Sequence, residues 1–227
     1  MKIDKLTLAF GNKIILRDID LEIKSGEFVF LIGYSWSGKT SLIRSIIGDF
    51  LPMRGDIILE NGMGLYRNMN EKILLEYRRS IGVIFQDYKL LESKTVYENI
   101  AFAMEVCGYS DSIISKKVPD ALEQVGLLIK KDKFVYELSG GEKQRIAIAR
   151  ALVHDPDLII WDEPTGNLDP TTSAEIMNIF KDLHAEGKTI ILATHDRTIV
   201  NDGKQRVIAF KDKWIVSDTL EWKYCLD

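Results

Sequence analysis

The sequence predicts an α/β fold with a mostly parallel sheet, an N-terminal antiparallel β subdomain and an inserted α-helical subdomain. Two observations carry this prediction. Short apolar runs at 28–32, 81–85, 158–161 and 189–193 alternate with longer amphipathic stretches, as strands and helices do in parallel sheets. Polar side chains follow these runs directly, and the carboxyl ends of parallel strands are where such sheets bind ligands.

Length and composition indicate one large domain, or a domain with an inserted subdomain. The chain has 227 residues, and its hydrophobic content of 46% supports a full core. The net charge of −4 gives no sign of a general nucleic-acid-binding surface. No apolar run approaches the roughly 20 residues of a membrane helix, and the N-terminus lacks a signal-peptide core. Cys107 and Cys225 show no metal or redox spacing, so we expect a cytoplasmic chain.

The β subdomain and the end of the chain are expected to consist of strands. Residues 2–9 alternate polar and apolar side chains, 14–23 continue as a second strand after a turn, and 55–60 form a short third strand. Asn70 is expected to cap the helix that follows. Residues 206–216 are predicted to form two edge strands before a short tail.

A phosphate-binding loop is predicted at residues 33–40, whose sequence Gly-Tyr-Ser-Trp-Ser-Gly-Lys-Thr fits the pattern G-x-x-x-x-G-K-[ST]. A strand precedes it and an amphipathic helix follows it, so the loop N–H groups and the helix N-terminus would face phosphate oxygens. Lys39 would reach the β- and γ-phosphates, and the Thr40 hydroxyl would ligate Mg²⁺. The core is therefore of the P-loop NTPase type. The expected nucleotide-binding residues are Gly33, Tyr34, Ser35, Trp36, Ser37, Gly38, Lys39, Thr40 and Ser41.

A helical subdomain is predicted at 87–137, because this block contains no strong strand. Its second helix, 111–125, is expected to be interrupted or bounded near Pro119. The segments 1–86 and 138–227 would form the catalytic core with its β subdomain.

A second glycine-rich helix start follows the helical block. Ser139 and Glu142 have the spacing of a capping box, and Gly140 and Gly141 lie between them. Such a helix N-terminus is a potential anion site, although a plain helix cap is the alternative.

Charged side chains follow the last two apolar runs. The adjacent carboxylates Asp162 and Glu163 suit a magnesium-assisted hydrolase, in which one carboxylate holds the metal through water and the other polarises the attacking water. Asp169 followed by Pro170 predicts a helix start with the aspartate as cap. His195, at the end of the next strand, could meet a γ-phosphate.

With these motifs assembled, the chain resembles the ATP-binding cassette (ABC) ATPases over essentially its whole length. Six motifs match in order and spacing: the phosphate loop 33–40, the Q-loop Gln86, the signature 138–142, the Walker B strand 158–162 with Glu163, the D-loop 167–169 and the switch His195. The resemblance implies ATP and Mg²⁺ as ligands and Phe10 as the aromatic residue that stacks on adenine. A buried turn residue is the alternative for Phe10.

The resemblance also implies a role for each polar residue. Glu163 would be the general base, and His195 would orient the γ-phosphate and the water. Gln86, a further catalytic residue, would bind Mg²⁺ together with Thr40 and Asp162. Two chains would pack head to tail as a homodimer. Ser139, Gly140, Gly141, Glu142 and Asp169 of one chain would then complete the ATP site of the other.

Within the family, the segments 85–91 and 95–103 are similar to the FtsE branch of cell-division ATPases. Those ATPases partner the membrane protein FtsX and drive cell-wall hydrolase activation. The resemblance implies a peripheral chain at the cytoplasmic face of the membrane, held by an FtsX-like subunit. The run 163–169 is shared with lipoprotein-releasing and macrolide-export ATPases, which stay open as alternatives. A DNA-repair ATPase would need a long coiled-coil insertion, so no nucleic-acid partner is expected.

Tryptophan stands at four positions where this family favours small residues: Trp36, Trp161, Trp214 and Trp222. One hypothesis is that all four codons are UGA, read as glycine in the source and rendered here as tryptophan. Four independent substitutions are the alternative. A genuine Trp36 either points into solvent or blocks the phosphate loop, and in the latter case the chain would be a binding module with weak ATP affinity. A genuine Trp161 would overpack the core beside Asp162.

Overall fold

The computed structural model describes residues 1–68, 70–163 and 170–220, which divide into two compact units. Unit 1 comprises Met1–Arg78 and the chain from Phe180 onward, and unit 2 comprises Arg79–Ile179. The predicted helical block, 87–137, lies inside unit 2.

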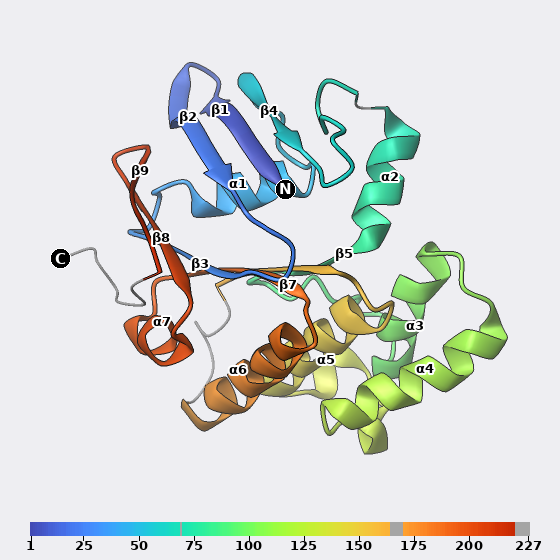
Figure 1. The fold of residues 1–227 in the computed structure, drawn as a ribbon. Coiled ribbons are helices and arrows are strands. Elements are labelled where there is room, and N and C mark those ends of the chain that lie inside the picture. Colours follow the sequence, from blue (N-terminus) through green and yellow to red (C-terminus); the bar gives the residue numbers. More distant parts are fainter. Residues whose placement is uncertain (69, 164–169, 221–227) are drawn as a thin grey trace. The chain divides into compact units, whose positions relative to one another are not determined.

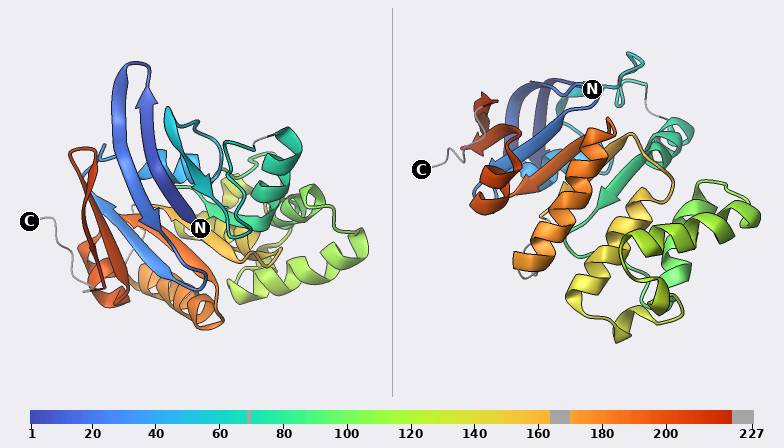
Figure 2. Two further views of the ribbon diagram at one scale, coloured as in Figure 1. Left: turned by 45° about the horizontal axis from the view of Figure 1, so that its top comes forward. Right: turned by 60° about the horizontal axis from the view of Figure 1, so that its bottom comes forward.

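Unit 1 contains a three-stranded antiparallel sheet in the order β2-β1-β4 (Figure 1). Its strands are β1 (Lys2–Phe10), β2 (Lys13–Glu22) and β4 (Arg54–Ile58). The long hairpin of β1 and β2 is drawn in blue in the left view of Figure 2. In β1 the side chains of Ile3, Leu6 and Leu8 are fully buried, and the register of β1 with β2 shifts between them. The predicted antiparallel β subdomain is confirmed.

The second sheet of unit 1 has the order β7-β3-β8-β9. Its strands are β3 (Phe28–Gly33), β7 (Thr189–Thr194), β8 (Arg206–Lys211) and β9 (Trp214–Thr219). β3 pairs in parallel with both β7 and β8, and β9 runs antiparallel to β8. All residues of β3 and β7 are buried, as expected for central parallel strands.

The expectation of two edge strands over 206–216 is wrong for β8. This strand lies between β3 and β9, so it has hydrogen-bonded neighbours on both sides. The reason is visible in its sequence, because Val207, Ile208, Ala209 and Phe210 are all buried and form an uninterrupted apolar run.

Unit 1 contains the helices α1 (Lys39–Ile46) and α7 (Arg197–Gly203). The boundaries between the units fall inside two further helices, α2 (Glu71–Ser80) and α6 (Pro170–Ala185). The predicted cap of α2 is confirmed, because Asn70 Oδ1 accepts a hydrogen bond from the backbone N–H of Ile73 at 2.9 Å. Within the described residues, no helix is long and apolar enough to cross a membrane.

Unit 2 combines a parallel strand pair with a group of helices. The strands are β5 (Ile81–Ile84) and β6 (Leu158–Asp162), and the helices are α3 (Val96–Val106), α4 (Asp111–Gln124) and α5 (Gly140–Leu152). Short 3-10 turns at Leu128–Lys130 and Val135–Glu137 lie between α4 and α5. The three α-helices share one apolar cluster and appear in green and yellow in the right view of Figure 2. The mostly parallel α/β fold with an antiparallel β subdomain and helical insertion is confirmed.

The break expected near Pro119 does not occur, because α4 continues through this residue. A proline inside a helix removes one hydrogen bond and crowds the preceding turn. Here Ile114 and Val118 before the proline and Leu122 after it are buried in the same apolar cluster. Buried residues on both sides of Pro119 therefore hold this segment as one helix.

Candidate active site

Two glycines shape the loop between β3 and α1. A Cβ atom on Gly33 would lie 2.3 Å from Ser37 Oγ and 2.9 Å from the carbonyl oxygen of Phe210. Gly38 has a φ of +102°, and its Cβ would lie 2.7 Å from the Leu16 side chain. Both positions therefore favour glycine, and the loop is tight, because the Ser37 N–H donates to the carbonyl oxygen of Tyr34 at 3.1 Å.

The start of α1 has no side-chain cap. Its N-cap is Gly38, no side chain bonds to the first N–H groups, and the first turn contains no acidic residue. Ser37 Oγ is buried without a hydrogen-bond partner in the part of the chain that the structure describes. These donors match the acceptor oxygens of a phosphate group.

Lys39 lies within this loop and is only 6% exposed. Its Nζ atom donates hydrogen bonds to the carbonyl oxygens of Gly33 at 2.7 Å and Tyr34 at 3.3 Å. The ammonium group is therefore held over the loop by neutral acceptors. Thr40 follows on the first turn of α1 and is exposed.

Trp36 points into solvent, since 99% of it is exposed. Its φ of +70° is in the left-handed region, which a non-glycine residue occupies at a cost of roughly 1–2 kcal/mol. Of the two orientations expected for this indole, the structure thus shows the one that leaves the loop open. Phe10 is 76% exposed at the end of β1, so the interpretation of Phe10 as a buried turn residue is wrong.

His195 stands at the sheet edge from which the phosphate loop leaves. Ile32, the residue before Gly33, pairs with Thr194 in the parallel register of β3 and β7, and His195 follows Thr194. The backbone beside His195 is fixed, because the Asp196 N–H donates to Thr194 Oγ1 at 3.0 Å and the Asp196 carboxylate caps α7. The exposed imidazole and the loop are therefore neighbours within unit 1.

Unit 2 has its own group of polar strand ends. Ile84 pairs with Trp161 in the parallel register of β5 and β6, so Gln86 and the pair Asp162–Glu163 leave the same edge. Asp162 is buried and Gln86 is exposed. Glu163 has a φ of +53°, a left-handed conformation that its surroundings must hold in place.

Arg150, which sequence reasoning missed, fixes the segment after Gln86. Its Nη1 donates to the carbonyl oxygen of Lys89 at 2.6 Å and its Nη2 to that of Tyr88 at 2.7 Å. Tyr88 and Lys89 both have positive φ angles, 60° and 49°, so the guanidinium stabilises a strained turn. Burial lowers the pKa of Arg150. An arginine inside the otherwise apolar run 146–152 was the available signal in the sequence.

The predicted capping box at the start of α5 is confirmed. Ser139 Oγ accepts from the backbone N–H of Glu142 at 3.4 Å, while Glu142 Oε2 accepts from the Ser139 N–H at 3.0 Å and from its hydroxyl at 3.2 Å. Gly140 and Gly141 form the first turn. A second residue that sequence reasoning missed, Lys130, donates to Glu142 Oε1.

Some predicted residues lie outside the described ranges. Asp169, the expected helix cap, and Trp222 are among them. Trp161 is fully buried in β6, and Trp214 is half-buried, with the Arg17 guanidinium 5.7 Å from its ring centroid. A UGG codon at these positions would contradict the recoding hypothesis.

Comparison with known proteins assigns this arrangement to a family. The model of the ABC transporter family matches residues 16–166. The chain belongs to the ABC transporter family. It is therefore an ATP-binding and ATP-hydrolysing protein of the P-loop type, as the motifs predict.

Particular ABC proteins are similar over nearly the whole chain. The cell division ATP-binding protein FtsE of Streptococcus pneumoniae (strain D39) is 46% identical over 212 residues, which cover 93% of this chain and 91% of that protein. FtsE of Bacillus subtilis is 46% identical over 209 residues, with 92% and 91% covered. A solved ABC cassette, a post-hydrolysis dimer bound to ADP and Pi, has a TM-score of 0.86 at 32% identity and covers 96% of this chain and 97% of its own.

Proposed function

We propose that this chain is an FtsE-like ATPase subunit that couples ATP hydrolysis to an FtsX-like integral membrane partner in cell division and cell-wall hydrolase control. The observation that carries the ATPase part is the start of α1, which has no side-chain cap at Gly38 and follows a loop whose two glycines leave no room for a Cβ. The similarity to FtsE over more than nine-tenths of the chain supports the cell-division part.

In unit 1, the loop 33–41 binds the triphosphate through its N–H groups and through Lys39. Binding requires Lys39 to exchange its carbonyl acceptors, Gly33 and Tyr34, for β- and γ-phosphate oxygens. Phe10, whose ring is accessible, stacks on the adenine. His195 donates a hydrogen bond that orients the γ-phosphate.

In unit 2, Glu163 acts as the general base. It takes a proton from the water that attacks the γ-phosphorus, the bond to the β-phosphate oxygen breaks, and ADP and phosphate are the products. When bound, Mg²⁺ would neutralise part of the phosphate charge. Thr40, Gln86 and Asp162 would hold it. These side chains fit a hard cation, because a hydroxyl, an amide oxygen and a carboxylate all offer oxygen ligands.

Two chains act together as a homodimer. In a head-to-tail arrangement, Ser139, Gly140, Gly141 and Asp169 of one chain complete the ATP site of the other. The dimeric ABC cassette that this chain resembles supports such an assembly. The chain is proposed to be peripheral, at the cytoplasmic face of the membrane, through its membrane partner.

A second candidate is a binding module that holds the membrane partner but binds ATP weakly. Trp36 in the phosphate loop is the observation that favours it. The solvent-directed indole argues against it. The relatives named FtsE likewise favour the cell-division assignment over an ATPase of lipoprotein release or macrolide export.

ATP binding and phosphate release by the purified chain, beside a Trp36→Gly chain, test the ATPase. We expect both chains to bind and hydrolyse ATP. If only the glycine chain does, the chain as written is the binding module and the recoding hypothesis gains support. If neither does, the ATPase proposal is wrong. Co-purification with FtsX from a relative, against the membrane subunit of a lipoprotein-releasing system, tests the cell-division assignment.

A further inference from the structure

Lys130 lies in the 3-10 turn before the signature and reaches the first turn of α5. Its Nζ atom pairs with Glu142 Oε1, while Glu142 Oε2 accepts from both the N–H and the hydroxyl of Ser139. The two charged side chains are 40% and 19% exposed, so the pair is partly shielded from solvent. A chain of direct contacts thus runs from Lys130 through Glu142 to the N-cap residue.

This contact chain matters because Glu142 has two opposing effects. Its carboxylate accepts a hydrogen bond from the backbone N–H of Ser139 at the start of α5, which stabilises the helix. The same carboxylate places a negative charge within one turn of a helix N-terminus that is proposed to receive a phosphate, and it already accepts the Ser139 hydroxyl proton. A phosphate must compete with Glu142 for this hydroxyl and is repelled by its charge.

Lys130 reduces both obstacles. Its ammonium group offsets the charge of the carboxylate and binds the oxygen that Ser139 does not use. The lowered charge on the carboxylate also weakens Oε2 as an acceptor, so the Ser139 hydroxyl can turn to a phosphate oxygen more readily.

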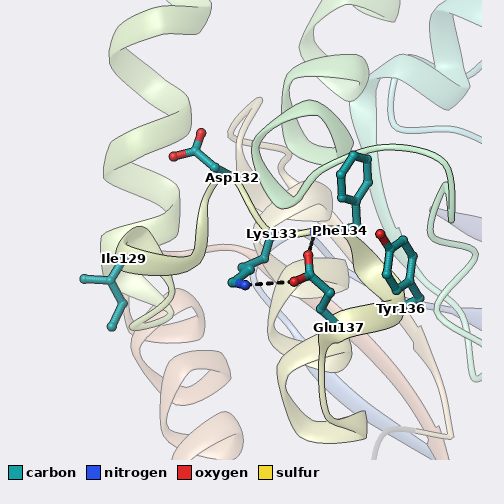
Figure 3. A pocket seen from close by; sticks show the side chains of 6 residues that line it. All are labelled: Ile129, Asp132, Lys133, Phe134, Tyr136 and Glu137. Atoms are coloured by element: carbon teal, nitrogen blue, oxygen red, sulfur yellow. Dashed lines mark hydrogen bonds and ion pairs between the residues drawn. The ribbon is translucent and has the colours of Figure 1, made fainter.

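The same unit contains a matched construction a few residues away. Lys133 Nζ donates to Glu137 Oε1 at 2.8 Å, and Glu137 Oε2 accepts from the backbone N–H of Phe134 at 2.7 Å (Figure 3). This pair caps a 3-10 turn of three residues, and its N-cap residue has no hydroxyl. It reproduces the lysine–glutamate ion pair and the glutamate cap, but neither Lys133 nor Glu137 makes these bonds with Ser139 or the start of α5.

We propose that Lys130 is a positioning residue for the signature, which acts through Glu142 to let Ser139 and the start of α5 receive the γ-phosphate of an ATP held by a second copy of the chain. This proposal rests on the proposed function, because it requires the head-to-tail ATP dimer.

The experiment measures ATP-dependent dimerisation by sedimentation, with hydrolysis blocked by Glu163→Gln, in the chain as written and in the Trp36→Gly chain. Four variants are compared: Lys130→Gln, Lys130→Arg, Lys133→Gln and the double variant Lys130→Gln with Glu142→Gln. ATP binding by the monomer, at protein concentrations below dimerisation, and thermal unfolding are recorded for each.

We expect Lys130→Gln to raise the ATP concentration needed for half-maximal dimerisation roughly tenfold, the size of one charge-assisted hydrogen bond. Monomer ATP binding should stay within about twofold, because the phosphate loop is untouched. Lys130→Arg should restore dimerisation, and the double variant should recover most of it, because it removes the uncompensated charge. A purely structural role for Lys130 would not be rescued by a second substitution at Glu142.

Lys133→Gln should dimerise as the unsubstituted chain does. Equal behaviour of Lys130→Gln and Lys133→Gln, or a double variant weaker than Lys130→Gln, would overturn the proposal for Lys130 while leaving the ATP dimer intact. If neither parent chain dimerises with ATP, the dimer itself is wrong, and the role of Lys130 falls with it.

Discussion

Helix α1 begins at Gly38 with no side-chain hydrogen bond to its first N–H groups, whereas α5 begins at Ser139 with a complete capping box. The α1 start also lacks acidic residues, while the first turn of α5 contains Glu142. One helix start therefore keeps its donors available, and the other satisfies them within the chain.

The difference shows what each helix start is suited to bind. Open donors around a glycine loop can bind a phosphate within a single chain. A capped start that contains a carboxylate can contact only a phosphate that another site already holds. It also needs Lys130 to compensate the charge of the carboxylate. We infer that α1 is the primary nucleotide site and that the signature is a secondary contact.

The largest effect is expected for Glu163→Gln. An amide cannot accept the proton of the attacking water, so turnover should fall about 10²–10⁴-fold, the usual contribution of a general base. ATP binding to the loop of α1 should be retained. Phosphate release and nucleotide binding measured on the same preparation check this. A variant that keeps more than about a tenth of the turnover would exclude Glu163 as the base.

Alanine at the glycine of each helix start compares the two directly. In Gly38→Ala the new Cβ would lie 2.7 Å from Leu16 at a φ of +102°, so we expect a stability loss of about 2–4 kcal/mol and loss of ATP binding. In Gly140→Ala the nearest atom is the Tyr88 hydroxyl at 3.8 Å, an ordinary contact. This variant should be unchanged or up to about 1 kcal/mol more stable.

Urea unfolding and ATP binding of the two alanine variants provide the measurement. Equal losses at Gly38 and Gly140 would show that the two helix starts are not built differently.

Ser139→Ala should have a smaller effect on the monomer. It removes the side-chain cap of α5, which typically costs about 1 kcal/mol, and leaves the phosphate loop of α1 unchanged. The free energy of unfolding should fall by that amount, monomer ATP binding should persist, and ATP-dependent dimerisation should weaken. The matched variant Ser35→Ala, in the exposed part of the phosphate loop, should have the opposite effect: ATP binding by the monomer should weaken. A monomer binding defect in Ser139→Ala would contradict the secondary role of the signature.

The sequence predicted the parts of this site that depend on local chemistry. The loop at 33–40 and the capping box at Ser139 follow from residue types at fixed spacing, and the structure has both in place. The solvent-exposed orientation of Trp36 was one of the two predicted orientations. The carboxyl ends of β3 and β7 meet as expected, because their parallel register is set by continuous apolar runs.

The parts that sequence did not reveal depend on tertiary contacts. Lys130 pairs with the Glu142 carboxylate 12 positions away. Arg150 donates to backbone carbonyls 61 and 62 positions away, and such acceptors carry no sequence signal. Helix α7 is short, and only its Asp196 cap could have indicated it. The predicted break at Pro119 was wrong because helix propensity takes no account of tertiary contacts. Burial of the apolar face of α4 outweighs the one hydrogen bond that the proline removes.

The smallest expected effect is a pH dependence that belongs to α5 alone. Hydrogen bonds from Lys130 and then from the Ser139 backbone hold the pKa of Glu142 below its usual range. A carboxyl with a lowered folded-state pKa stabilises the fold fully above its usual pKa, about 4.3, and loses that contribution as the pH falls through the folded-state value. The stability difference between the unsubstituted chain and Glu142→Gln should therefore shrink between about pH 5 and pH 3.

In Lys130→Gln the pKa of Glu142 should rise, so the same loss should begin at higher pH. Amide hydrogen exchange of the first turns of the two helices, followed over this range, is the sharpest measurement. The start of α5 should lose protection as Glu142 is protonated, whereas the start of α1 should not respond, since it has no acidic residue in its first turn. If the amide protection of both helix starts changed equally with pH, the Glu142 carboxylate would not stabilise α5 locally. The proposed difference between the uncapped start of α1 and the capped start of α5 would then be wrong.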